Sequence, residues 1–246
     1  MYNGLYTIQT IQNFLYFRKI LNIQLMKKFT FLFLLIPFLI FSQKNFEYKK
    51  DFENILKESK NKDSDLNYNK LLEKFNKTDT TLTDRQVLAL LIGFTDNTYY
   101  KPYKDLEFSR NLYKLNDDKK FDEVIKEGNK FIVHHPFDLK ALIEVSYAYY
   151  KKGNQSLADS YLMKTSLIFK AMIYSGNGKS IDNPIFALNP SDGQDFIKKA
   201  FGAKIGSMGS GRDKNGYFID MLEMKNGEES EILYFIIPHA TKKMFE

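Results

Sequence analysis

The sequence predicts an α+β protein in which a helical N-terminal part packs against a small β-rich C-terminal part. Glycine marks the division, because nine of the 13 glycines lie after residue 175. Before that position, apolar residues recur at the three- and four-residue spacing of amphipathic helices. The tail instead contains short β-branched and aromatic runs between turn residues. We therefore expect a helical domain at residues 43–175 and a small, mainly antiparallel β-sheet module at residues 176–246.

The segment ahead of the helical domain has the three parts of a secretory signal peptide. Met26 and two lysines precede the apolar block 29–41, and the small residue Ser42 follows it. An apolar run of only about 10–14 residues is typical of a signal rather than of a membrane span. We predict a signal peptide at 26–42, cleavage after Ser42, and a periplasmic or secreted protein. Residues 1–25 are then a non-translated or unstructured leader; a retained anchor, a nearby cut and an unusually long basic leader are the alternatives.

Removal of this leader changes the charge of the chain. The full sequence has 36 basic and 30 acidic residues, but residues 1–42 hold four of the basic residues and no acidic one. The mature chain therefore carries a net charge of only +2, without the clustered basic face that nucleic-acid binding needs. The absence of cysteine excludes disulfides and a lipidated N-terminal cysteine. The abundance of Lys, Asn, Ile, Phe and Tyr is typical of an AT-rich bacterial genome.

The first helices are predicted from amphipathic spacing and end signals. Residues 46–60 and 66–75 form two candidate helices with charged outer faces. The sequence from Thr83 to Gln86 fits a capping box, which opens an apolar helix at 87–94. Pro102 then interrupts the chain before a further helix at about 104–115.

The next segment has the clearest periodicity. Residues 121–138 and 139–153 form two helices, and a third helix runs over residues 158–169. On the third helix, apolar residues follow the i, i+3, i+4 rule and predict one buried stripe. The members of this stripe are Ala158, Tyr161, Leu162, Thr165, Ile168 and Phe169.

This segment resembles a tetratricopeptide repeat over about one and a half units of the roughly 34-residue period. The resemblance is carried by Phe121 at the turn, Val124 and Ala158 at the small inward positions, Gly153 between helices and Pro136 at the end. An ordinary pair of packed helices is the alternative, since Gly128 lies mid-helix at a cost of about 1 kcal/mol relative to alanine. We therefore expect a repeat-like pair inside a larger helical domain.

The tail is predicted to form a β-α-β-β-β module. Asn226-Gly227 lies between two apolar runs and indicates a hairpin. The expected elements are a strand at 184–188, a helix at 192–201 opened by Ser191, and strands at 203–208, 217–224 and 231–237.

Four segments make the chain similar to a family of exported Bacteroidota proteins, domain of unknown function 4919. These segments are residues 79–83, 100–103, 129–148 and 175–180. The resemblance covers nearly all of 43–246 and implies export and a two-part α+β architecture. It implies no activity and no catalytic residues.

The repeat resemblance places a partner-binding groove on the first helix of each repeat. The groove residues would be Lys140, Ile143, Tyr147 and Tyr150, with Ser109, Tyr113 and Asn116 in the preceding unit. They lack the Lys/Asn set with which some such repeats bind a terminal carboxylate, so binding of a peptide C-terminus is not predicted. Since no catalytic cluster is evident, the sequence favours a non-enzymatic module that binds a protein or peptide in the cell envelope.

The alternative is a small-ligand binder or hydrolytic enzyme that uses the C-terminal sheet. Residues 206–213 are predicted as a glycine-rich loop in which Ser207 and Arg212 could contact a ligand. The spacing of a phosphate-binding P-loop is missing, which favours a flexible connector. His134 and His135 are expected at a helix C-terminus in a structural role. We therefore expect no metal, no cofactor, no nucleic-acid partner and no membrane span after signal cleavage.

Overall fold

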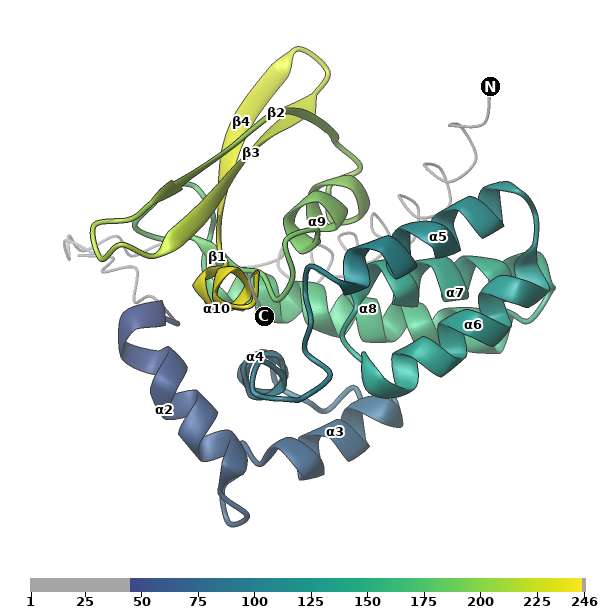
Figure 1. Ribbon diagram of the computed structural model, residues 1–246, viewed down its shortest axis with the longest axis horizontal. Coiled ribbons are helices and arrows are strands. Elements are labelled where there is room, and N and C mark those ends of the chain that lie inside the picture. Colours follow the sequence, from purple (N-terminus) through teal and green to yellow (C-terminus); the bar gives the residue numbers. More distant parts are fainter. Residues whose placement is uncertain (1–44, 245–246) are drawn as a thin grey trace, which may run out of the picture. The chain divides into compact units, whose positions relative to one another are not determined.

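The structure, a computed structural model, describes residues 45–244, so the predicted leader and signal peptide lie outside the described residues. The order of elements confirms a mixed architecture, with helices in the N-terminal part and a four-stranded sheet at the C-terminus (Figure 1). The helices are α2 (Tyr48–Lys60), α3 (Tyr68–Asn76), α4 (Asp84–Phe94), α5 (Asp105–Asp117), α6 (Phe121–His134), α7 (Leu139–Lys151), α8 (Gln155–Ser175), α9 (Asp192–Ala200) and α10 (Pro238–Lys242). The strands are β1 (Ile185–Phe186), β2 (Lys204–Arg212), β3 (Phe218–Asn226) and β4 (Glu229–Ile236). Within residues 45–244, no helix has the length and apolar character needed to cross a bilayer.

Local capping determines where several helices begin. The predicted capping box is confirmed at α4, where the Thr83 hydroxyl accepts the Gln86 N–H at 3.2 Å and the Gln86 side chain accepts the Thr83 N–H at 3.1 Å.

Helix α8 continues to residue 175, beyond its predicted end, because no breaker precedes Gly176. The predicted buried stripe on this helix is wrong for Leu162, which is 47% exposed.

Helices α5 to α8 form two consecutive helix pairs. Helix α7 contacts α5, α6 and α8, and therefore lies at the centre of this group (Figure 1). The mid-helix Gly128 has a packing reason, because a Cβ atom at this position would overlap Val145 Cγ2 of α7. The glycine therefore allows α6 to approach α7 closely.

The four-stranded sheet has the order β1-β4-β3-β2. Strand β1 pairs with β4 in parallel, and the other pairs are antiparallel, as predicted for this module. The predicted hairpin is confirmed: Asn226 pairs with Glu229, and Gly227 between them has a φ of 65°, which glycine adopts without strain. Helix α9 packs on one face of the sheet, where the backbone of Gly193 lies against Leu222 and Phe235.

A buried histidine joins the first and last elements of the described chain. The Nε2 atom of His239 lies 2.9 Å from the Ala187 carbonyl oxygen and 3.2 Å from that of Leu188. Because carbonyls only accept hydrogen bonds, Nε2 carries the proton, and Nδ1 accepts from the Tyr48 hydroxyl at 3.4 Å. The ring stacks on Phe186 with centroids 4.6 Å apart. The helix α10 that carries His239 was not predicted.

This histidine predicts a loss of stability in acid. Burial lowers the pKa of His239 to about 3, so between pH 6.5 and 3 the unfolded chain binds a proton that the folded chain does not. The free energy of unfolding should therefore fall as the pH drops, by at most about 1.4 kcal/mol per pH unit from this group. Asp138 and Asp220 act in the opposite direction. Burial raises the pKa of each to about 6, so their contribution to the free energy of unfolding is lost as the pH rises through that value.

Comparison with a His239→Gln variant isolates the contribution of the histidine. The difference in unfolding free energy between the wild type and the variant should shrink steadily from pH 6.5 to pH 3, measured by urea denaturation at each pH. Parallel stability curves for the two proteins would contradict the assignment.

Candidate functional site

The central helix α7 carries the predicted partner-binding residues. Ile143, Tyr147 and Tyr150 are three or four positions apart, which places them on one side of the helix. Tyr150 is 51% exposed, whereas Ile143 and Tyr147 are half-buried. Tyr113, which is 56% exposed, lies on the neighbouring helix α5. We call Tyr113, Ile143, Tyr147, Tyr150 and Lys151 the α5/α7 face.

The aromatic rings of this face are held by their neighbours. Tyr147 packs edge-on against Phe121 with ring centroids 6.0 Å apart. The Lys151 Nζ atom lies 5.3 Å from the centroid of Tyr147 and 5.9 Å from that of Tyr150. A cation over a ring face is attracted by the ring quadrupole, so Lys151 orders the two tyrosines. The face therefore combines exposed aromatic surface with one positive charge.

Two of the predicted groove residues on α5 join helices instead of lining a groove. The Ser109 hydroxyl donates to Asp138 Oδ2 at 2.9 Å, and Asn116 Nδ2 donates to Glu144 Oε2 at 2.7 Å. Ser109 and Asn116 are both buried. The prediction that they line an open groove is wrong, because these side chains satisfy polar groups between α5 and α7.

Lys140 also has an internal partner. Its Nζ atom lies 2.8 Å from Asp195 Oδ1 on α9, and the Asp195 side chain is only 3% exposed. Burial alone would lower the pKa of Lys140, but the adjacent Asp195 carboxylate outweighs burial and raises it. The ion pair therefore connects α7 to α9, and Lys140 is engaged within the protein.

Further acidic groups surround this ion pair. Burial raises the pKa of Asp192 well above its usual value, and the same cause raises that of Glu144. Asp138 caps α7 by accepting the Ala141 N–H at 2.8 Å. Within the described residues, Asp195 Oδ2 is buried without a hydrogen-bond partner. These enclosed carboxylates join α5, α7 and α9 through their contacts with Ser109, Asn116 and Lys140.

The predicted glycine-rich loop is a strand. Residues 206–212 belong to β2, so the expectation of a loop that could cradle a ligand is wrong. Ser207 donates both its N–H and its hydroxyl to Glu223 Oε2, at 2.8 and 2.9 Å, beside a register shift between Ile205 and Met208. This interaction satisfies the backbone of an irregular strand, which is a structural role.

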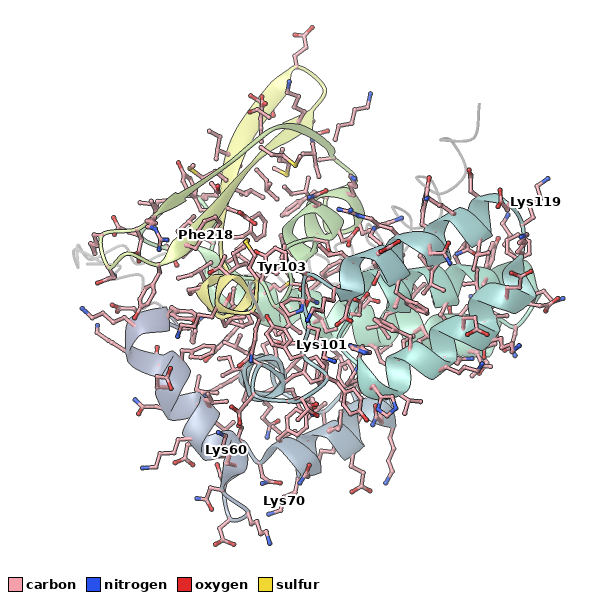
Figure 2. The ribbon with its side chains drawn as sticks, in the orientation of Figure 1. Lys60, Lys70, Lys101, Tyr103, Lys119 and Phe218 are labelled. Atoms are coloured by element: carbon pink, nitrogen blue, oxygen red, sulfur yellow. The ribbon has the colours of Figure 1, made fainter. Side chains whose placement is uncertain are left out.

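Arg212 has a similar local role at the end of β2. Its Nη1 atom donates to the Gly216 carbonyl at 2.7 Å, and its guanidinium lies 6.0 Å from the ring centroid of Phe218. Figure 2 labels Phe218, the first residue of β3. Both contacts close the β2–β3 connection. Ser207 and Arg212 are therefore placed on the sheet module, away from the α5/α7 face.

The histidines make packing contacts. His134 stacks on Tyr99 with centroids 4.1 Å apart, and His135 stacks on Phe131 at 4.0 Å and lies 3.2 Å from Asp105 Oδ2. As predicted, both lie at the C-terminal end of α6. In the described part of the chain, no group of three His, Cys, Asp or Glu residues is arranged to hold a metal ion.

The residues that connect distant elements were not predicted from the sequence. Asp195 and His239 have partners 55 and 52 residues away, and no short-range pattern indicates such pairs. One sequence signal could have indicated Asp195. It is a charged residue beside the apolar Phe196 in a helix, and a charged residue in such a position suggests a buried partner.

Comparisons with known proteins place the chain in one family. No curated protein and no solved structure matches it significantly. One family model, described as "Domain of unknown function (DUF4919)", matches residues 53–245, which include most of the described helices and the whole sheet. The chain therefore belongs to this family, DUF4919.

Proposed function

We propose that this protein is an exported, non-enzymatic module that binds another protein or a peptide through the α5/α7 face. The carrying observation is the exposed aromatic surface on two adjacent helices, with Tyr113 at 56% and Tyr150 at 51% exposure. Tyrosine is enriched at protein interfaces because it offers a large contact area for few rotatable bonds. The predicted signal peptide at 26–42 supports a partner in the periplasm or beyond.

The arrangement of the helices supports a tetratricopeptide-like mode of binding. Helix α5 contacts α7, and α6 contacts α7, as expected when one helix pair stacks on the next. In such arrays, the first helix of each pair faces the partner. Here these first helices are α5 and α7, which carry the exposed tyrosines.

The chemistry of the face favours an extended segment with apolar and acidic side chains. Within the described residues, Lys151 lies over two tyrosine rings and has no carboxylate partner. Lys140 is already paired with Asp195, so the available surface begins at Ile143 and continues towards Lys151. An apolar partner side chain would cover the rings, and a carboxylate would pair with Lys151.

A double variant tests this proposal. We expect Tyr147→Ala together with Tyr150→Ala to weaken partner binding by at least about tenfold, since central aromatic residues carry much of the binding energy of an interface. The measurement is affinity capture of partners from the cell envelope, followed by titration of the purified partner against both proteins.

Val133→Ala is the matched control, because Val133 is 73% exposed on α6 and lies outside the α5/α7 face. This control should bind the partner like the wild type. Unchanged binding by the double variant, or an equal loss in the control, would contradict the proposal.

A further inference from the structure

The four-stranded sheet has one protected edge and one open edge. At the first edge, β1 has only two residues, and its Phe186 N–H donates to the Ser175 hydroxyl oxygen at 2.8 Å. At the other edge, β2 has nine residues without a proline and pairs only with β3 (Figure 1). Natural proteins usually shorten, cover or interrupt an edge strand, because its free backbone groups can pair with another chain. The open side of β2 is therefore a candidate interaction surface.

The pairing with β3 shows which backbone groups of β2 are free. The Asp213 N–H donates to the Tyr217 carbonyl at 2.9 Å, so Asp213 faces β3. Pairing continues without a register shift from Met208 to Arg212, and the backbone groups of successive residues point alternately to the two sides of a strand. Every second residue before Asp213 therefore faces β3, and the residues between them face the open side. These residues are Met208, Ser210 and Arg212, whose outward N–H and C=O groups we call the β2 edge.

The β2 edge is accessible to a partner. Its three residues are exposed, and no group of the described residues is hydrogen-bonded to their backbone N–H and C=O groups. The apolar side chain of Met208 is 62% exposed. A strand added at this edge would gain main-chain hydrogen bonds and would cover the Met208 side chain.

Basic side chains lie at both ends of this open side. Lys204, the first residue of β2, lies opposite Lys225 of β3, and like charges in this position repel each other. The Arg212 guanidinium donates to a neutral carbonyl, that of Gly216. Within the described residues, neither Lys204 nor Arg212 has a carboxylate partner, and β2 itself has no acidic residue. The charge of this surface is therefore complementary to an acidic partner.

We propose that the β2 edge binds an extended segment of another protein that carries an apolar and an acidic side chain four positions apart. Met208 and Arg212 are four positions apart and lie on the same face of the sheet, since side chains alternate along a strand. Partner residues opposite them would lie on that same face. The apolar side chain would pack against Met208, and the acidic one would pair with Arg212. This surface uses none of the residues of the α5/α7 face.

A second copy of β2 is a less suitable occupant of this edge. Pairing of two β2 strands would bring together two copies each of Lys204 and Arg212, with no acidic residue on either strand. An acidic segment supplies the missing charge instead. Charge complementarity therefore favours a different chain.

Titration with a designed peptide tests this assignment by nuclear magnetic resonance of the ¹⁵N-labelled protein. The probe is the peptide Thr-Leu-Thr-Val-Thr-Glu-Thr with blocked termini, and its counterpart has Lys in place of Glu. We expect the probe to shift the amide signals of Met208, Ser210 and Arg212, with a dissociation constant of about 0.1–1 mM, as for a short peptide that is ordered on binding. The lysine counterpart should bind at least about threefold more weakly.

Ser210→Pro is the decisive variant. It removes an N–H that points to the open side, and proline is tolerated at such positions of an edge strand. It should weaken binding of the probe at least about tenfold, because a hydrogen bond is lost and the proline ring obstructs the added strand. Ser210→Ala keeps the N–H and is the matched control, which should bind like the wild type. Arg212→Gln is an independent check, since the probe and its lysine counterpart should then bind alike.

Three results would overturn the proposal. The first is the absence of shifts at the β2 edge at about 5 mM probe, five times the weakest expected constant. The others are equal binding of the probe to Ser210→Pro and the wild type, and equal binding of the two peptides to the wild type. A dimer in sedimentation that is lost in Ser210→Pro would assign the edge to a second copy and would also overturn the proposal.

Discussion

Replacement of Gly128 by alanine is expected to destabilise the protein by about 2 kcal/mol, although alanine is the better helix former by about 1 kcal/mol. The reason is the close approach of α6 to α7, where the added methyl group would overlap Val145 Cγ2. Both helices are buried at this point, so the overlap can be relieved only by shifting a packed element. The measurement is the free energy of unfolding in urea.

A second substitution shows whether Val145 is the cause. Val145→Ala alone should cost about 1–2 kcal/mol through the cavity it leaves. In the double variant, the smaller side chain at position 145 makes room for the methyl group added at position 128. The loss should then be clearly smaller than the sum of the two single losses. A stabilising Gly128→Ala change, or strictly additive losses, would show that the close approach is not the reason for the glycine.

Replacement of Lys140 by methionine is expected to cost about 3 kcal/mol. Asp195 is almost fully buried, and its Oδ1 atom has Lys140 as its ion-pair partner at 2.8 Å. Removal of one member of a buried pair leaves the other charge in the interior without compensation. Since Asp195 Oδ2 already lacks a partner in the described residues, no neighbouring donor compensates for the loss. The measurement is again the free energy of unfolding in urea.

An exposed ion pair of the same helical layer provides the control. Lys152 lies 3.0 Å from Asp122, and both side chains are largely exposed. Lys152→Met should therefore cost no more than about 1 kcal/mol. Adding Asp195→Asn to Lys140→Met should recover part of the loss, because the variant then buries no unpaired charge. Equal losses for Lys140→Met and Lys152→Met would contradict a structural role for the Lys140–Asp195 pair.

Local sequence signals predicted much of the fold. The capping box at Thr83 and the Asn226-Gly227 turn were correct because each depends on residues within a few positions of one another. The helix periods and the order β-α-β-β-β follow from the same kind of short-range pattern. The glycine-rich segment 206–212 was misassigned because glycine suggests a loop, whereas here pairing with β3 keeps it extended.

The α5/α7 face could be predicted only in part, because contacts between residues far apart in the sequence decide which of its side chains are accessible to a partner. Tyr150 of α7 is exposed, but Lys140 is paired with a residue of α9. Ser109 and Asn116 are likewise engaged by Asp138 and Glu144, which lie 29 and 28 residues away in the sequence. In each case the deciding contact is a tertiary one, which spacing along a single helix does not encode.

Site-specific crosslinking can show in cells whether the α5/α7 face binds a partner. A photo-crosslinking amino acid is placed at position 150 on this face or at position 133 on α6, both of which are exposed to solvent. Cells that express each protein are irradiated, and crosslinked products are compared after purification. We expect a discrete product from position 150 that disappears when Tyr147→Ala is added, and none from position 133. The absence of a product at position 150, or the same product at both positions, would contradict partner binding by the α5/α7 face.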